Sequence, residues 1–278
     1  SVRETRPRPF CLRGSIAQGC CLKRRSNCRD VASAVSNIKV TLEYDGTRFS
    51  GFQKQKNHRT VQGEFERALA KLFQNKVRLV ASGRTDSGVH AEAQVVNFRI
   101  HSKIPPPKIQ LALNHYLPED LAVTAVEKVR SDFHSRYSPR AKVYEYQVFH
   151  SKSRSPLNRF RTYHVPYPLN LAKMRLGARL LSGRHNFRAF ESSGGRRLNS
   201  IRTIQRFQIQ KKGKIVSFTI RSNGFLYKMA RSVVGTLLEV GSGRLKLSGL
   251  KQILATKDRS LVGPTVPARG LTLKRVMY

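Results

Sequence analysis

The chain has 278 residues, with 53 Lys and Arg against 16 Asp and Glu, a formal charge of +37, and 39% hydrophobic residues. This composition excludes disorder throughout, and the length allows a core of ordinary size in one or two domains. No apolar run approaches the roughly 18 residues that a bilayer crossing needs, which argues against a membrane-spanning protein. So large an excess of positive charge predicts a polyanionic partner, and nucleic acid is favoured over a membrane surface.

Residues 1–36 are expected to form a basic extension outside the fold. The first 30 residues carry eight basic side chains, two acids and no sustained hydrophobic period. Such a segment is typical of an organellar transit peptide, and a basic RNA-binding arm is the alternative. We therefore expect a mitochondrial or chloroplast location, with cytoplasm or nucleus as alternatives. Subtracting the +6 of this segment leaves +31, so the basic character belongs to the folded body.

The cysteines and histidines give no sign of a metal centre. The spacing of the four cysteines matches no paired zinc-ligand pattern; they are Cys11, Cys20, Cys21 and Cys28. The eight histidines are scattered, and none forms a helical His-Glu pair with metal-binding spacing. An isolated surface or core position is the simpler interpretation for each. We therefore expect no metal centre.

The first half of the body alternates strand and helix patterns. Residues 38–44 alternate apolar and polar side chains, as in a half-buried strand. Thr60 can cap a helix, and its apolar stripe is formed by Val61, Phe65, Leu69 and Leu72. Strands are predicted for 77–81 and 93–100, on either side of the turn 82–90, and residues 121–129 close the first half. The triple proline at 105–107 precedes a short helix over 108–116.

The second half repeats this alternation. A strand over 142–150 precedes a helix that Asn170 begins, with a stripe of Leu171, Met174, Ala178 and Leu181. A hairpin is predicted to pair 201–210 with 214–220 across a turn that holds Lys211, Lys212 and Gly213. The next helix, over 225–239, directs these residues inward: Phe225, Met229, Val233 and Leu237.

Two similar halves, 37–140 and 141–278, indicate an α+β protein. Mostly antiparallel strands with helices between them predict one large mixed sheet with flanking helices. Such a sheet leaves one face free for RNA.

The stretch SGRTDSGVH, residues 82–90, places Arg84 and Asp86 on one turn between Gly83 and Gly88. It lacks the spacing of a phosphate-binding P-loop and the alternating acids of a calcium loop. From composition alone, the simpler interpretation is a structural turn in which Asp86 bonds its own backbone.

These residues also resemble the signature of the TruA family of tRNA pseudouridine synthases. The resemblance continues in family order through EYDGTRFSGFQ (43–53), DFHSRYSPRAKVYEY (132–146), NGFLYKMARSVVG (223–235) and KDRSLVGPTVPARGLTL (257–273). It covers the chain from Ile38 to Tyr278. Two differences occur: Phe52 stands where many relatives have Trp, and Ala230 is smaller than the common Val.

The resemblance implies a pseudouridine synthase fold and an RNA isomerisation without a cofactor. The uracil of a uridine is cut from its ribose, turned and rejoined through carbon. The substrate implied is tRNA, at positions 38 to 40 of the anticodon stem-loop, although some relatives act on other sites and RNAs. Members of the family usually act as homodimers.

Particular residues match the family's site. Asp86 matches the catalytic aspartate, which acts either as a nucleophile at the anomeric carbon or as a base. Tyr144 matches the tyrosine that lies against the flipped base. Arg231 matches the arginine that pairs with the carboxylate, and a cation there favours the ionised form and holds its rotamer. Arg84 is expected to contact RNA or to help displace the base, although any arginine here could contact a phosphate.

Other matched residues are expected to shape the cleft without performing chemistry. Asp45, Phe52 and Gln53 fall in this group. Leu271 and Leu273 are expected to form an apolar wall behind the uracil, although core strand residues have the same sequence pattern.

A rival function of another class is a non-catalytic RNA-binding or ribonucleoprotein-assembly protein on the same scaffold. The charge of the body, +31, exceeds what one anticodon arm requires, and phosphate contacts serve either role. The presence of Asp86, Tyr144 and Arg231 favours the enzyme.

Overall fold

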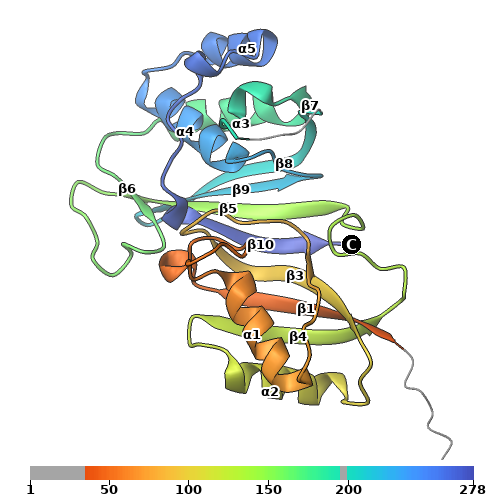
Figure 1. Ribbon diagram of the computed structural model, residues 1–278. Helices are drawn as coiled ribbons and strands as arrows, with labels where there is room; N and C mark the ends of the chain where they lie inside the picture. Colours follow the sequence, from red (N-terminus) through yellow and green to blue (C-terminus); the bar gives the residue numbers. More distant parts are fainter. Residues whose placement is uncertain (1–34, 195–198) are drawn as a thin grey trace, which may run out of the picture. The chain divides into compact units, whose positions relative to one another are not determined.

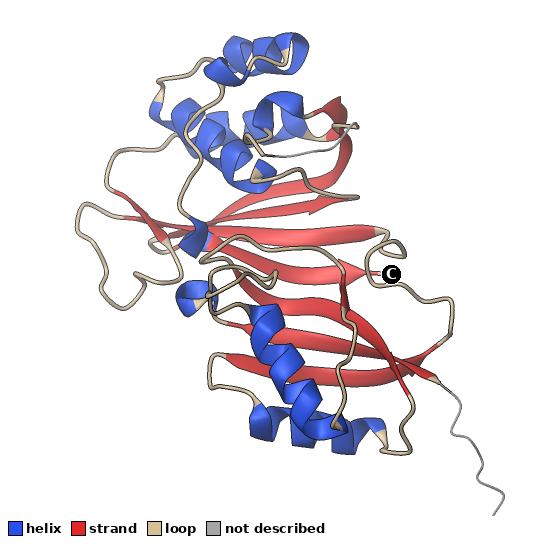
Figure 2. Cartoon of the chain, viewed as in Figure 1, coloured by secondary structure: helices blue, strands red, loops and turns tan. Residues whose placement is uncertain are grey.

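A ten-stranded mixed sheet is the central layer of the part of the chain described by the computed structural model, residues 35–194 and 199–278 (Figures 1 and 2). The four cysteines and nearly all of the expected extension 1–36 lie outside the described residues. None of the helices in the described part combines the length and the apolar run that a membrane crossing requires.

The first half contains the following elements in chain order: β1 (Ser36–Tyr44), η1 (Gly46–Arg48), α1 (Val61–Phe73), β2 (Val80–Ala81), β3 (His90–Ile100), α2 (Pro106–Tyr116) and β4 (Leu121–Val129). The second half contains β5 (Ala141–His150), β6 (Tyr163–Val165), α3 (Leu171–Leu181), β7 (Gly183–Asn186), η2 (Arg188–Phe190), β8 (Ile201–Lys212), β9 (Ile215–Ser222), α4 (Met229–Ser242), α5 (Leu247–Thr256), η3 (Arg259–Leu261), η4 (Ala268–Gly270) and β10 (Leu271–Met277).

Strand β10 joins the two halves of the sheet. The strand order is β4-β1-β3-β10-β5-β9-β8-β7, with β2 paired to β3 and β6 paired to β5. β10 runs parallel to β3 and antiparallel to β5, and the other pairs are antiparallel except β5 with β6. The predicted α+β fold with one large mixed sheet is confirmed.

Each half of the sheet has its own hydrophobic core. In the first, α1 and α2 cover strands β1, β3 and β4; in the second, α3 and α4 cover β5, β8 and β9, with α5 beside α3 (Figure 1). Tyr144 on β5 packs against both cores. The two cores therefore meet where β10 and β5 pair.

Local sequence signals set several of these elements correctly. The Thr60 hydroxyl accepts a hydrogen bond from the backbone N–H of Gly63, and the Asn170 side chain accepts one from Lys173. These caps begin α1 and α3 as predicted. Helix α2 begins two residues earlier than expected, because prolines are tolerated in a first helical turn, where backbone N–H groups lack helical partners.

Three predicted elements differ from the structure. Of the predicted strand 77–81 only Val80–Ala81 pairs, with Asn97 and Val96 of β3. The predicted hairpin turn was wrong in part: Lys211 and Lys212 belong to β8, and the chain reverses at Gly213 and the next residue. The helix predicted over 225–239 begins only at Met229, because Lys228 has a left-handed backbone with φ of 57°.

Gly235 lets α4 approach a neighbouring loop closely. A Cβ atom there would lie 1.8 Å from the Pro264 carbonyl oxygen, which is backbone and has little freedom to move. We expect Gly235→Ala to lower the free energy of unfolding by about 1–3 kcal/mol, measured by urea denaturation. Gly249→Ala is the matched helical control, since its Cβ would meet only the flexible Leu245 side chain. Equal stability of the two variants would contradict this packing account.

Candidate active site

The loop between β2 and β3, residues 82–89, carries Arg84 and Asp86. At its start, the Ser82 N–H donates to Val95 O (2.8 Å) and the Gln94 amide donates to Gly83 O (3.0 Å). Lys142 Nζ donates to Ser82 O (2.5 Å). At its end, the Val89 N–H donates to Asp86 O (3.1 Å). These bonds fix the loop backbone and hence the direction of its side chains.

A second segment supports this loop from the first half. Gly51 has a φ of 88°, and a Cβ there would lie 3.0 Å from the Thr85 carbonyl oxygen. The Phe52 N–H donates to that oxygen (3.1 Å). The buried Tyr44 hydroxyl lies 2.8 Å from Thr85 Oγ1. The motif around 43–53 therefore holds the loop that carries Asp86.

Asp86 pairs with Arg231 across 145 positions of sequence. Arg231 Nη1 donates to Asp86 Oδ2 at 2.9 Å, and Arg231 Nε donates to the Val266 carbonyl oxygen at 2.8 Å. The Arg231 side chain is only 13% exposed and the Asp86 side chain only 22% exposed. Held at two points in the first turn of α4, the guanidinium orients the carboxylate and balances its charge.

Tyr144 projects from β5 toward the same region. Its ring meets Phe225 edge to face, with centroids 4.9 Å apart. Burial, with the charges of Tyr44 and Asp86, raises the pKa of its hydroxyl above the ordinary range, so Tyr144 is a neutral phenol at physiological pH. Such a neutral ring can pack on a base.

These residues share an open cleft of about 1170 Å³. Of the residues proposed from sequence, those lining it are Phe52, Gln53, Arg84, Asp86, Tyr144 and Leu271. Arg231 is not among the lining residues, and it is linked to the cleft by its hydrogen bond to Asp86. Asp45 and Leu273 are not among its lining residues; Leu273 is buried in the core of the first half.

The cleft is strongly positive in its described lining. Five cationic side chains line it, against the two acids Asp86 and Glu191; the cations are Arg78, Arg84, Arg136, Lys142 and Lys228. Arg84 is exposed and makes no ion pair with a described residue. The lining suits a phosphate backbone, while its aromatic residues suit bases.

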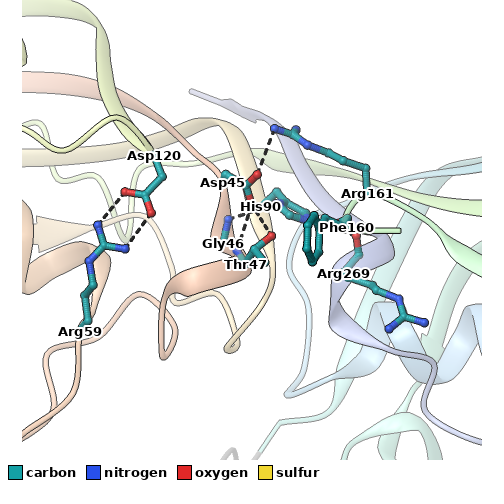
Figure 3. A network of polar contacts seen from close by, with 9 residues as sticks. All are labelled: Asp45, Gly46, Thr47, Arg59, His90, Asp120, Phe160, Arg161 and Arg269. Carbon is teal, nitrogen blue, oxygen red and sulfur yellow. Dashed lines mark hydrogen bonds and ion pairs between the residues drawn. The ribbon is translucent and has the colours of Figure 1, made fainter. Parts of the chain in front are cut away.

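Asp45 takes part in a network of polar contacts around His90, the first residue of β3 (Figure 3). His90 is buried, with Nδ1 3.0 Å from Asp45 Oδ1 and Nε2 2.9 Å and 3.1 Å from the carbonyl oxygens of Phe160 and Arg269. Because both carbonyls only accept, Nε2 must carry a proton. The network ties the end of β1 to the start of β3, to the loop after β5 and to the segment before β10. His90 is therefore a connected core histidine, not an isolated one.

The same network determines the charge of Asp45. Burial alone would raise the pKa of its carboxyl, but two hydrogen bonds from Thr47, together with His90 and Arg161, hold it below its ordinary value. Asp45 is therefore anionic at neutral pH. A neighbouring pair, Arg59 and Asp120, forms two 2.7 Å hydrogen bonds on the side of the first half (Figure 3).

Sequence reasoning missed several lining residues: His134, Arg136, Tyr137, Lys142, Tyr227 and Lys228. Four of them lie within the block 132–146, beside Tyr144. An exposed aromatic next to an arginine, as in Arg136-Tyr137, is the signal that could have found this part of the cleft. Within the described residues, no cluster of three or more His, Cys, Asp or Glu could hold a metal ion.

The Tyr44 hydroxyl gives a pH test of the support beneath the loop. Burial, opposed by hydrogen bonds to Thr85 and Gln94, raises its pKa from 10.0 to about 12. The unfolded chain therefore loses this proton first, and stability falls as pH rises from about 10 to 12. In that window we expect the free energy of unfolding of the intact protein to fall by about 1.4 kcal/mol per pH unit more than that of Tyr44→Phe. Urea titrations at pH 8 to 11.5 measure this, and parallel curves would contradict it.

Fold and site together define a protein with a strongly positive cleft that holds one arginine-paired carboxylate. A family model described as tRNA pseudouridine synthase matches residues 40–138 and 178–278. Curated proteins called tRNA pseudouridine synthase A are similar over nearly their whole length. That of Acetivibrio thermocellus is 44% identical over 242 residues, 87% of this chain and 99% of the relative. Those of Clostridium acetobutylicum and Streptococcus thermophilus are 41% and 42% identical, covering 88% and 86% of this chain and 100% and 98% of the relatives.

The chain therefore belongs to the TruA family of tRNA pseudouridine synthases and is an isomerase. The resemblance drawn from the motifs is confirmed. A solved archaeal box H/ACA sRNP Nop10-Cbf5 complex also matches, with a TM-score of 0.36 and 12% identity over 73% of this chain and 44% of that one; so low a likeness supports no statement about this chain.

Proposed function

We propose that this protein isomerises uridine to pseudouridine at positions 38 to 40 of the tRNA anticodon stem-loop, with Asp86 as the group that acts on the ribose. The observation that carries the proposal is the ion pair of Asp86 with Arg231 in a positive cleft. A carboxylate repels phosphate in a lining that otherwise attracts it, so its presence there, oriented by an arginine that is itself held at two points, supports a chemical role.

The reaction needs one bond broken and one formed at the same sugar carbon. The N1–C1′ bond of uridine breaks, the uracil turns, a C5–C1′ bond forms, and the hydrogen of C5 is replaced by one on N1. Substrate and product are isomers, so the balance requires no cofactor. Asp86 acts either by adding to C1′ or by taking a ribose proton, and in both roles a carboxylate stabilises the positive character of the sugar.

The other residues prepare this step. A uridine in a stem must leave its stack, and the Tyr144 ring offers a replacement surface for the flipped base. Arg84 is exposed on the loop that carries Asp86. It is placed to fill the space that the flipped nucleotide leaves in the stem, or to hold the phosphate of that nucleotide. Leu271 supplies an apolar wall.

Carbodiimide-based sequencing of unmodified tRNA transcripts tests this proposal. The purified protein, incubated without any added cofactor, should produce pseudouridine signal in the anticodon stem-loop. Signal confined to other tRNA positions would overturn the proposed target positions but would still support the proposed reaction. Absence of signal on transcripts that the protein binds would favour the non-catalytic RNA-binding alternative.

The proposal includes a homodimer and an organellar location. The family resemblance supports the dimer, and light scattering of the full chain with and without tRNA tests it; a monomer in both cases overturns it.

The Arg-rich, acid-poor residues 1–36 support the location. A fluorescent fusion should reach an organelle, and the same fusion without these residues should not; equal distributions would contradict targeting by this segment.

A further inference from the structure

The turn at residues 134–138 presents a large aromatic ring beside the active-site cleft. His134, Arg136 and Tyr137 all line the cleft. Tyr137 is 76% exposed, well above the other exposed aromatic residues of the described part, which are Tyr116 (40%), Tyr227 (42%) and Phe160 (46%). Nothing in the chemistry assigned to Asp86, Arg231 and Tyr144 uses this turn.

The turn is held together by its own hydrogen bonds. The N–H groups of Tyr137 and Ser138 both donate to the His134 carbonyl oxygen, at 3.2 and 3.0 Å. The His134 N–H donates in return to Ser138 Oγ at 3.2 Å, and the Arg136 N–H donates to His134 Nδ1 at 3.2 Å. The local conformation therefore does not depend on a ligand.

The turn is also anchored to the sheet through one buried residue. Ser135 is fully buried; its N–H donates to Asn97 Oδ1 (2.9 Å) and its hydroxyl donates to the Val80 carbonyl oxygen (2.7 Å). The Tyr278 hydroxyl donates to the Ser135 carbonyl oxygen (3.0 Å). An exposed ring on so fixed a backbone loses little entropy when it binds something.

The geometry of the ring is that of a stacking surface. The His134 and Tyr137 rings stack with centroids 4.4 Å apart and an interplanar angle of 29°. The Arg136 guanidinium lies 5.6 Å from the Tyr137 centroid. His134 thus backs the Tyr137 ring, and the high exposure leaves the ring accessible to a further planar group. A planar occupant that also carries negative charge is a nucleotide, whose base stacks while its phosphate meets the cation.

We propose that Tyr137 stacks on a nucleobase next to the target uridine and so holds the RNA strand beside the flipped nucleotide in the cleft. This inference rests on the proposed function, because it needs an RNA target uridine at Asp86. Tyr137 is a positioning residue: it contacts the substrate strand but not the reacting atoms.

The test uses anticodon stem-loop RNAs in which 2-aminopurine replaces the nucleotide immediately 5′ or 3′ of the target uridine. Loss of one stacked base should weaken RNA binding by Tyr137→Ala by about 5- to 150-fold. The bound 2-aminopurine should fluoresce more brightly with Tyr137→Ala than with the intact protein, at one of the two positions. Tyr137→Phe, which keeps the ring, should restore both affinity and quenching.

Two further variants separate stacking from other contacts. Tyr116 on α2 is the matched control: it is 40% exposed, neighbours His115, has Lys71 5.6 Å from its ring, and is not among the cleft residues. Tyr116→Ala should change neither the RNA affinity nor the fluorescence of the bound 2-aminopurine. Arg136→Ala should reduce the slope of log affinity against log salt by about 1, whereas Tyr137→Ala should leave that slope unchanged.

Three outcomes would overturn the inference: affinity and quenching of Tyr137→Ala equal to those of the intact protein, an equal loss in Tyr116→Ala, or a salt slope that falls as in Arg136→Ala. Pseudouridine formation by the intact protein on the unlabelled RNA is measured in parallel. If it occurs while the Tyr137 effects do not, the inference fails and the proposed function stands. If it does not occur, the proposed function fails, whatever the binding of Tyr137→Ala.

Discussion

Replacing Asp86 by Asn should abolish pseudouridine formation while leaving RNA binding nearly intact. Asn has the same size and still offers an oxygen to Arg231 Nη1, so the cleft should keep its shape. It lacks the negative charge needed to attack the sugar, to take a proton or to stabilise positive character at C1′. We expect the single-turnover rate to fall by on the order of 10³-fold or more, with a change in RNA affinity within about threefold.

The measurement is single-turnover conversion of a radiolabelled anticodon stem-loop, with affinity measured on the same RNA by filter binding. Asp120→Asn is the matched control, because Asp120 is also paired with an arginine, has a side chain 20% exposed and is not among the cleft residues. It should retain full activity. A rate for Asp86→Asn within about tenfold of the intact protein would show that another group performs the chemistry.

Arg231→Met should lower kcat by about 100-fold and change KM little. Methionine fills a similar volume but removes the hydrogen bond to Asp86 Oδ2 and the charge that balances the carboxylate. The carboxylate is then free to rotate, and small displacements of a catalytic group are known to cost about two orders of magnitude in rate. The Val266 carbonyl oxygen also loses its donor, so some loss of stability should accompany the kinetic effect.

Steady-state kinetics separate orientation of Asp86 from RNA binding. Arg231→Lys keeps the charge but cannot hold both Asp86 and Val266 at once, so its kcat should fall between those of the intact protein and the Met variant. Arg59→Met, which breaks the pair with Asp120, is the control for the loss of an arginine. If Arg231→Met raised KM and left kcat unchanged, Arg231 would be a phosphate contact and not a positioning residue.

Much of the fold follows from local patterns in the sequence. The alternation over 38–44 appears as β1, and the caps Thr60 and Asn170 begin α1 and α3. The start of α4 could not be predicted from these patterns. The helical spacing of apolar residues continues back to Phe225, and no residue type marks the left-handed backbone at Lys228 that delays the helix. Phe225 instead packs its ring on Tyr144.

The residues of the site could be predicted only where they lie within a motif of the family. Asp86, Arg231 and Tyr144 were named from resemblance, and no periodicity links residues so far apart in the chain. The contact of Asp45 with His90 and the anchoring of Ser135 by Tyr278 were not predictable at all. They join groups far apart in the sequence, because the order of the strands in the sheet is not their order in the chain.

The position of β10 between β3 and β5 also governs when activity can arise during synthesis. β10 follows both halves in the chain, yet its pairing brings together the strands that flank the cleft. A nascent chain made through α4 already contains both Asp86 and Arg231 but has no strand to bridge the two halves of the sheet. We therefore expect the two walls of the cleft to be joined only after Leu271–Met277 have left the ribosome, so that catalytic competence is gained in one late step.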